Sequence, residues 1–249
     1  MFQKLKVIEQ HPTFIVINKR AGIITERNPF EKITAESLVD EYLSSGKRTP
    51  FSLDQIKNDP KKRTNFKKNI GQNKSFVGVV HRLDRVSSGC LLFAKNKSSL
   101  KYFNELIAKR KIKKTYLALV HNKPNKESGV IRNYLVKDQK SKSARIYDQA
   151  VENGMESTLS YELIHSNKFA HLLKIQLDTG RFHQIRAQLG HIGCPIIGDE
   201  KYGSNIPFLP LAICLHAYKL NFRLKNGDEF ELKADLPNTR YWKDFVHHL

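Results

Sequence analysis

The sequence predicts an α+β fold with a largely antiparallel β-sheet and few helices. Many short β-prone runs are spread along the 249 residues, whereas few segments have helical periodicity. Two of the runs are joined by Asn226-Gly227, a dipeptide that tolerates the positive φ angles of a tight hairpin. A chain of this length with 40% hydrophobic residues can bury a sizeable core, so we expect a single domain over residues 1–249.

The N-terminal part is expected to contain a strand and then a helix. Residues 14–18 form a short β-prone run that ends at the turn Lys19-Arg20-Ala21-Gly22. Thr34 is placed to cap a helix. One face of that helix would carry Leu38, Val39, Tyr42 and Leu43.

Residues 44–75 differ in composition from the rest of the chain. They contain few apolar residues and many Lys, Asn, Ser and Gly. From residue 57 to residue 74, seven basic residues accompany a single acidic one, Asp59. This composition predicts a long polar insertion, which either forms a solvated loop or contacts a polyanion.

After residue 75 the pattern predicts one more long helix and most of the sheet. Ser98 or Ser99 is expected to cap a helix that carries Leu100, Phe103, Leu106 and Ile107 at helical spacing. The helix is followed by five basic residues within 109–114. Strand-like runs lie at 79–80, 91–94, 115–120, 130–136, 158–164, 172–177, 220–224 and 230–234.

The net charge gives the first indication of function. Forty-three Lys and Arg against 24 Asp and Glu give +19 and a pI near 9.8. Such an excess attracts polyanions, of which nucleic acid is the commonest, although a generally basic composition or an anionic membrane would also account for it. No apolar run is long enough to span a membrane, no secretory signal is expected, and Cys90, Cys194 and Cys214 form no paired pattern. We therefore expect a cytoplasmic protein.

Two polar clusters could carry chemistry. In the first, Asp84 lies between Arg82 and Arg85 in a loop between two strand-like runs, which suits either a structural ion pair or a catalytic carboxylate held ionised by its neighbours. The second cluster, residues 179–193, has the pattern of a tight turn that leads into a short helix. His183 and Arg186 could share one face of this helix, which could equally be an ordinary amphipathic helix.

Several common motifs are missing from the sequence. It contains no GxxxxGK[ST] loop and no GxGxxG, so we expect no nucleotide cofactor. A GxSxG elbow is also absent. His183 and His191 have no carboxylate or thiol at ligand spacing, so we expect no metal ion and no other cofactor.

The motifs together resemble those of the pseudouridine synthases related to the ribosomal large-subunit and tRNA enzymes. Residues 81–89 are similar to the family's HRLDxxTSG, and residues 179–186 to its TGRTHQIR. The similarity extends to VxNKPAG at 14–22, KxYxA at 114–118, HPIxGDxxYG at 193–203 and LHA at 215–217. This sequence departs from the pattern at Arg20 (for Pro), Ser87 (for Thr), Cys90 (for Leu) and Phe182 (for Thr).

The resemblance implies a mixed, mostly antiparallel sheet flanked by helices and loops, as in the family's fold. It also implies an isomerase that needs no cofactor. Asp84 would be the nucleophile, which either attacks C1′ of a uridine or removes a proton from C2′ to give a glycal. Tyr116 would stack on the uracil and could take the proton from C5. Arg186 would pair with Asp84, with Arg85 as the competing partner.

The implied partner is structured RNA, either rRNA or tRNA. A stacked base cannot be turned, so the uridine would be flipped out. Arg82 would either fill the space that the base leaves or contact the RNA backbone there. Arg85 and His183 would also bind RNA, and the insertion would add Lys61, Lys62, Arg63, Lys67 and Lys68. We expect a monomer without the small N-terminal RNA-binding domain of many members.

Two other functions remain open. A catalytically silent RNA-binding protein of the same fold is opposed by the intact Asp84, Tyr116 and Arg186. A hydrolase of glycosidic bonds usually needs two carboxylates, and only Asp84 lies in a suitable motif.

Overall fold

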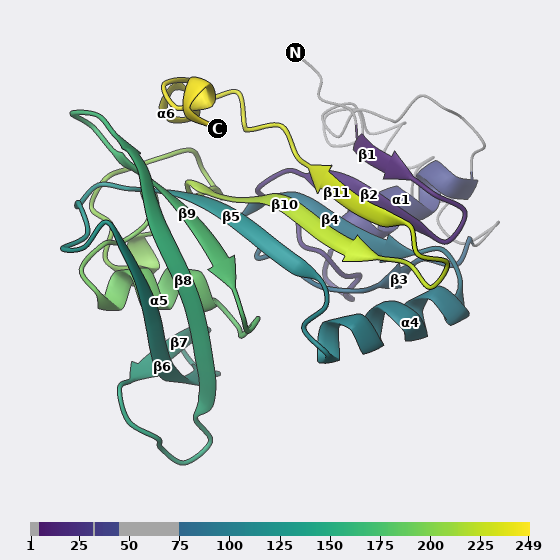
Figure 1. The fold of residues 1–249 in the computed structure, drawn as a ribbon, viewed down its shortest axis with the longest axis horizontal. Coiled ribbons are helices and arrows are strands. Elements are labelled where there is room, and N and C mark those ends of the chain that lie inside the picture. Colours follow the sequence, from purple (N-terminus) through teal and green to yellow (C-terminus); the bar gives the residue numbers. More distant parts are fainter. Residues whose placement is uncertain (1–4, 32, 45–74) are drawn as a thin grey trace.

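The computed structural model describes residues 5–31, 33–44 and 75–249, and the strands within them form one mixed sheet. Along its main path the strands lie in the order β1-β2-β4-β10-β5-β9-β8-β6-β7, while β11 pairs with β10 and β3 pairs with β4 (Figure 1). All named pairs are antiparallel except β4 with β10. The predicted α+β class with a mixed, mostly antiparallel sheet is confirmed.

The elements have the following bounds. The strands are β1 (Lys6–Gln10), β2 (Phe14–Lys19), β3 (Gly78–Val79), β4 (Ser88–Ala94), β5 (Lys113–Val120), β6 (Ser128–Asp138), β7 (Ser143–Tyr147), β8 (Met155–Ser166), β9 (His171–Leu177), β10 (Leu215–Arg223) and β11 (Glu229–Lys233). The α-helices are α1 (Ala35–Ser44), α4 (Lys97–Ala108), α5 (Gln184–His191) and α6 (Arg240–Lys243), and the 3₁₀ turns are η1 (Glu200–Tyr202) and η2 (Val246–His248).

Strands β2 and β4 are buried on both faces. In β2, Phe14 and Val16 enter a cluster with Phe103 of α4, whereas Ile15 and Ile17 enter a second cluster that contains residues of α1. Successive side chains of a strand point to opposite faces, so every position of such a strand needs an apolar residue. This explains why the sequence has unbroken apolar runs at these strands.

Helices α1 and α4 are capped by side chains. Thr34 caps α1 as predicted, since the backbone N–H of Ser37 donates to its Oγ1 at 3.1 Å. The predicted cap of α4 at Ser98 or Ser99 is wrong. Asn96 is the cap, and its Oδ1 accepts the backbone N–H of Ser99 at 2.8 Å. Asn and Ser cap helices about equally well, so residue type alone does not choose between them.

The predicted hairpin at Asn226-Gly227 joins β10 to β11. Gly227 has φ +99°, and the backbone N–H of Leu224 closes the turn on the carbonyl of Asp228 at 2.8 Å. Two strands, β1 and β7, were not predicted. They are the first and last strands of the sheet path, and each lacks a continuous buried face, so the sequence carries little alternation there.

Most of the predicted insertion at 44–75 lies outside the described residues, and so do Lys61, Lys62, Arg63, Lys67 and Lys68. Among the helices that are described, none combines the length and the apolar character needed to cross a membrane.

Gly89 lies in the parallel pairing of β4 with β10, the one parallel pair among the described strands. It has φ +114°, and it pairs with Ala217 of β10. A Cβ at Gly89 would lie 2.2 Å from the carbonyl oxygen of Ala217, which is far inside van der Waals contact. Only glycine therefore allows β10 to approach the strand that follows Asp84.

We predict that Gly89→Ala lowers the free energy of unfolding by more than about 3 kcal/mol, because backbone strain is added to a clash with backbone atoms. Gly193→Ala is the matched control. Gly193 also has a positive φ, +76°, but nothing lies within 4 Å of its Cβ position. Gly193→Ala should lower the free energy of unfolding by only about 1–2 kcal/mol. Urea unfolding measures both, and equal losses would contradict the steric argument.

Candidate active site

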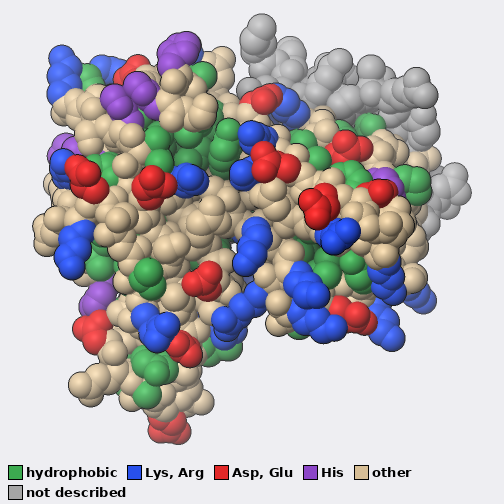
Figure 2. All heavy atoms as spheres, in the orientation of Figure 1, with side chains coloured by type: hydrophobic (Ala, Val, Ile, Leu, Met, Phe, Trp, Pro, Cys, Tyr) green, Lys and Arg blue, Asp and Glu red, His purple; other side chains and the backbone are tan. Residues whose placement is uncertain are grey.

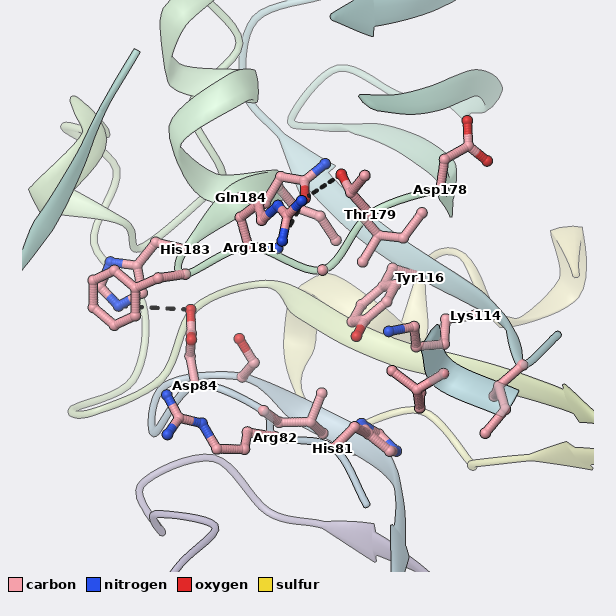
Figure 3. A pocket seen from close by; sticks show the side chains of 18 of the residues that line it. His81, Arg82, Asp84, Lys114, Tyr116, Asp178, Thr179, Arg181, His183 and Gln184 are labelled. Atoms are coloured by element: carbon pink, nitrogen blue, oxygen red, sulfur yellow. Dashed lines mark hydrogen bonds and ion pairs between the residues drawn. The ribbon is translucent and has the colours of Figure 1, made fainter. Parts of the chain in front are cut away.

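Asp84 lies on the loop between β3 and β4, and it lines a cavity of about 600 Å³ (Figure 3). The cavity is lined by this loop, by the C-terminal end of α4, by the start of β5 and by residues 177–186. These segments are distant in sequence. They meet because β5 lies between β9 and β10, and β10 lies next to β4.

The Asp84 loop is fixed to residues 19–25 by backbone and side-chain hydrogen bonds. The hydroxyl of Thr25 donates to the carbonyl of Leu83 at 3.0 Å and accepts the N–H of Leu83 at 3.1 Å. The N–H of Gly22 donates to the carbonyl of Arg85 at 2.7 Å. The two residues that flank Asp84 in sequence are therefore both held by this segment.

Lys19 is buried below the same loop. Its Nζ donates to the carbonyl of Ile23 at 2.9 Å, to that of Arg20 at 3.0 Å and to that of Arg85 at 3.4 Å. Burial lowers the pKa of Lys19 to about 7, although the negative charge of Asp84 opposes this shift. The Lys of the sequence motif at 14–22 thus supports the loop from within the protein.

Arg186 links Asp84 to a second carboxylate, Asp199. Its Nη1 donates to Oδ2 of Asp84 at 3.1 Å, while Nε and Nη2 donate to the two oxygens of Asp199 at 2.7 and 2.8 Å. The side chains of Arg186, Asp199 and Asp84 are 6%, 2% and 24% exposed. Burial alone would lower the pKa of Arg186, but Asp199 and then Asp84 raise it above its ordinary value. Asp84 is the most exposed member of this triad.

His183 also faces Asp84, although not from a helix. It lies immediately before α5 with φ +53°, so the expectation that it shares a helical face with Arg186 is wrong. Its Nε2 lies 3.8 Å from Oδ2 of Asp84 (Figure 3). Burial lowers the pKa of His183 to about 4, so the ring is neutral at pH 7.

The other wall of the cavity carries Tyr116, Lys114 and His81 (Figure 3). Tyr116 lies on β5, and its burial, reinforced by the charge of Asp84, raises the pKa of its hydroxyl, which stays protonated. Burial lowers the pKa of Lys114. His81 accepts the N–H of Leu92 at its Nε2, and burial lowers its pKa to about 3.

The two arginines near Asp84 in sequence, Arg82 and Arg85, form ion pairs with glutamates. Arg82, 61% exposed, pairs with Glu26 at 3.2 Å, and Arg85 pairs with Glu31. Of the two candidate partners, Arg186 rather than Arg85 therefore contacts Asp84.

From the sequence, no role was predicted for Asp199 or Tyr202. Both lie in the motif at 193–203, and the hydroxyl of Tyr202 is 2.9 Å from Nδ1 of His183. The GDxxYG motif contains both residues, but the motif does not show which groups their side chains contact. Among the described residues, no group of three or more His, Cys, Asp or Glu could hold a metal ion; independence from metal stays a prediction.

Comparisons with known proteins point to one family. The model of the family described as RNA pseudouridylate synthase matches residues 13–191. The chain is 31% identical over 224 residues to a Haemophilus influenzae protein named as an uncharacterized RNA pseudouridine synthase, covering 90% of this chain and 84% of the relative. It is also 31% identical over 237 residues to ribosomal large subunit pseudouridine synthase C of Rickettsia felis, covering 93% and 67%.

Solved structures show the same fold. The human protein RNA pseudouridylate synthase domain containing 4 aligns with a TM-score of 0.69 at 20% identity, covering 98% of this chain and 92% of the other. Human RNA pseudouridylate synthase domain containing 1 aligns with a TM-score of 0.66, also at 20% identity, covering 95% and 85%.

The buried position of Asp199 gives a stability prediction. Asp199→Asn keeps the shape but removes a charge that compensates Arg186, so we expect the free energy of unfolding to fall by about 3 kcal/mol. Glu156→Gln is the control, because its pair with Arg132, at 3.6 Å, is exposed on both sides and should contribute less than about 1 kcal/mol. Urea unfolding of both variants tests this, and a loss at Asp199 as small as that of the control would contradict it.

Proposed function

The chain belongs to the RNA pseudouridylate synthase family, and from that premise we propose that it converts uridine in structured RNA to pseudouridine with Asp84 as its nucleophile. The class of reaction is an isomerisation. The observation that carries the assignment of Asp84 is the hydrogen bond from Arg186 to one oxygen of a carboxylate that faces a cavity.

The two oxygens of Asp84 have different surroundings. Oδ2 accepts the hydrogen bond from Arg186 and faces His183. Oδ1 has no hydrogen bond or ion pair with any other described residue. Oδ1 is therefore the oxygen that reacts, while Oδ2 anchors the group. Attack on C1′ and proton removal from C2′ both need an ionised carboxylate with one accessible oxygen, so this geometry suits either route.

The cavity suits a flipped base. Its volume of about 600 Å³ is within the range of small-molecule sites. The uracil would enter between Asp84 and the ring of Tyr116, after the nucleotide has left the RNA stack. Because the Tyr116 hydroxyl keeps its proton, stacking on the base is its first role, and removal of the C5 proton would require that pKa to fall once substrate is bound.

Basic residues around the cavity support RNA as the substrate. The lining includes Arg82, Arg110, Lys113, Lys114 and Arg181. Figure 2 shows Lys and Arg side chains along the hollow between the part that carries β6 to β8 and the part that carries α4. Phosphates of the RNA would lie along these cations. Relatives named as ribosomal large subunit pseudouridine synthases favour rRNA over tRNA.

The experiment that tests the proposal compares two aspartates of one cavity. Asp84→Asn removes the negative charge with little change in shape, and we expect pseudouridine formation to fall by at least about 10³-fold with RNA binding retained. Asp178→Asn is the control, because Asp178 also lines the cavity but its carboxylate points away from Asp84 (Figure 3). Asp178→Asn should keep nearly full activity.

Both variants are read by mapping pseudouridine in total RNA from cells without the gene and from cells complemented with each variant. The same map identifies the RNA and the uridine. Unchanged pseudouridine with Asp84→Asn would refute the nucleophile. A map that does not depend on the gene at all would favour a catalytically silent RNA-binding protein.

A further inference from the structure

We propose that His183 is a positioning residue for Asp84, and that Tyr202 holds its imidazole in the tautomer whose Nε2–H faces the carboxylate. The proposal rests on Asp84 being the nucleophile. His183 was expected from the sequence to contact RNA, whereas here it orients Asp84. Tyr202, for which no role was predicted, orients His183.

The hydrogen-bond network around Tyr202 fixes the direction of its O–H. The backbone N–H of Ala144 in β7 donates to the Tyr202 oxygen at 2.8 Å, so that oxygen is an acceptor there. The phenol has one hydrogen of its own, and Nδ1 of His183 is 2.9 Å away. Burial raises the pKa of Tyr202 to about 12, so this hydrogen is present at pH 7. The natural arrangement has Tyr202 donating to Nδ1.

The other tautomer, which carries its hydrogen on Nδ1, is less favourable at both ring nitrogens. If Nδ1 carried the hydrogen, the Tyr202 hydroxyl would have no described acceptor for its own hydrogen. The lone pair of Nε2 would then face the negative charge of Asp84 from 3.8 Å. With Tyr202 as donor, Nε2 carries the hydrogen and directs it to the carboxylate. Because the ring is neutral at pH 7, only one nitrogen is protonated.

Two aromatic contacts hold this arrangement in place. The ring of Phe182 stacks on that of His183, with 3.8 Å between centroids and 17° between planes. The guanidinium of Arg186 lies over the ring of Tyr202 at 5.1 Å. Tyr202 therefore contacts both donors that converge on Asp84, and Phe182, a departure from the family pattern, restricts the plane of the imidazole.

A neutral N–H donor beside Asp84 would orient the carboxylate without lowering its reactivity. Arg186 shares its charge between two carboxylates, and a second cation beside Asp84 would bind the nucleophile more tightly and weaken its attack. A neutral N–H orients Oδ2 and leaves Oδ1 reactive. At 3.8 Å the contact is longer than a hydrogen bond, and we expect it to shorten when RNA closes the site, as catalytic hydrogen bonds often do.

The tautomer can be observed directly. Long-range ¹H–¹⁵N NMR spectra of the full chain labelled with ¹⁵N-histidine distinguish Nε2–H from Nδ1–H, and His183→Gln assigns the resonance by its loss. We expect Nε2–H in the wild type at pH 7, and an increase of Nδ1–H in Tyr202→Phe. An Nδ1–H wild type would overturn the proposal.

Two amide variants connect the tautomer to the rate. Gln places its amide nitrogen near the position of Nε2, and Asn near that of Nδ1. At saturating RNA, His183→Gln should react within about tenfold of the wild type, and His183→Asn about 10²-fold more slowly, with RNA affinity unchanged in both. Equal rates for the two variants, or a loss of RNA affinity in place of rate, would overturn the proposal.

Failure of the proposed function has a different result. A wild-type chain that forms no pseudouridine on any RNA would refute the function, whereas the NMR measurement would still decide the hydrogen-bond network because it needs no substrate.

Discussion

A guanidinium that is almost fully buried must be compensated, and the arrangement of this site follows from how Arg186 is compensated. The buried Asp199 accepts hydrogen bonds from Nε and Nη2 of Arg186. The third nitrogen, Nη1, is therefore free to donate to Asp84. Removal of Asp199 would leave Nε and Nη2 of this buried guanidinium without a carboxylate acceptor. Arg186 thereby holds Oδ2 of Asp84, whereas Oδ1 has no hydrogen bond to another described residue.

The fold brings these groups together through contacts that are distant in sequence. Residues 19–25 hold the backbone on both sides of Asp84, and the close approach of β10 to Gly89 fixes the strand that follows it. At the start of β10, Nδ1 of His216 is within hydrogen-bond distance of the Ser88 hydroxyl, at 2.8 Å. On the opposite side, β7 supplies the N–H that orients Tyr202. The sequence motifs thus supply residues that position Asp84 or its neighbours.

Features that depend on local pattern could be predicted from the sequence, and features that depend on long-range contacts could not. The sheet class, the hairpin at Asn226-Gly227 and the Thr34 cap follow from alternation, turn residues and capping chemistry. The edge strands β1 and β7 were missed because neither has a continuous buried face. Asp199 was missed because nothing local shows that its carboxylate meets a guanidinium on another element. The left-handed φ of His183 is likewise imposed by its surroundings. The roles of Asp84, Tyr116 and Arg186 came from resemblance and stay predictions.

The most direct test of this account is the single-turnover rate of pseudouridine formation by Arg186→Met, measured beside Arg85→Met. Arg186→Met keeps much of the side-chain length but removes the charge that anchors Asp84, and we predict a rate at least about 10²-fold lower with RNA affinity little changed. Arg186→Lys should recover part of the rate, because the charge returns without the planar fork. Arg85→Met should stay close to the wild type, since Arg85 pairs with Glu31. A fully active Arg186→Met together with an inactive Arg85→Met would contradict the account.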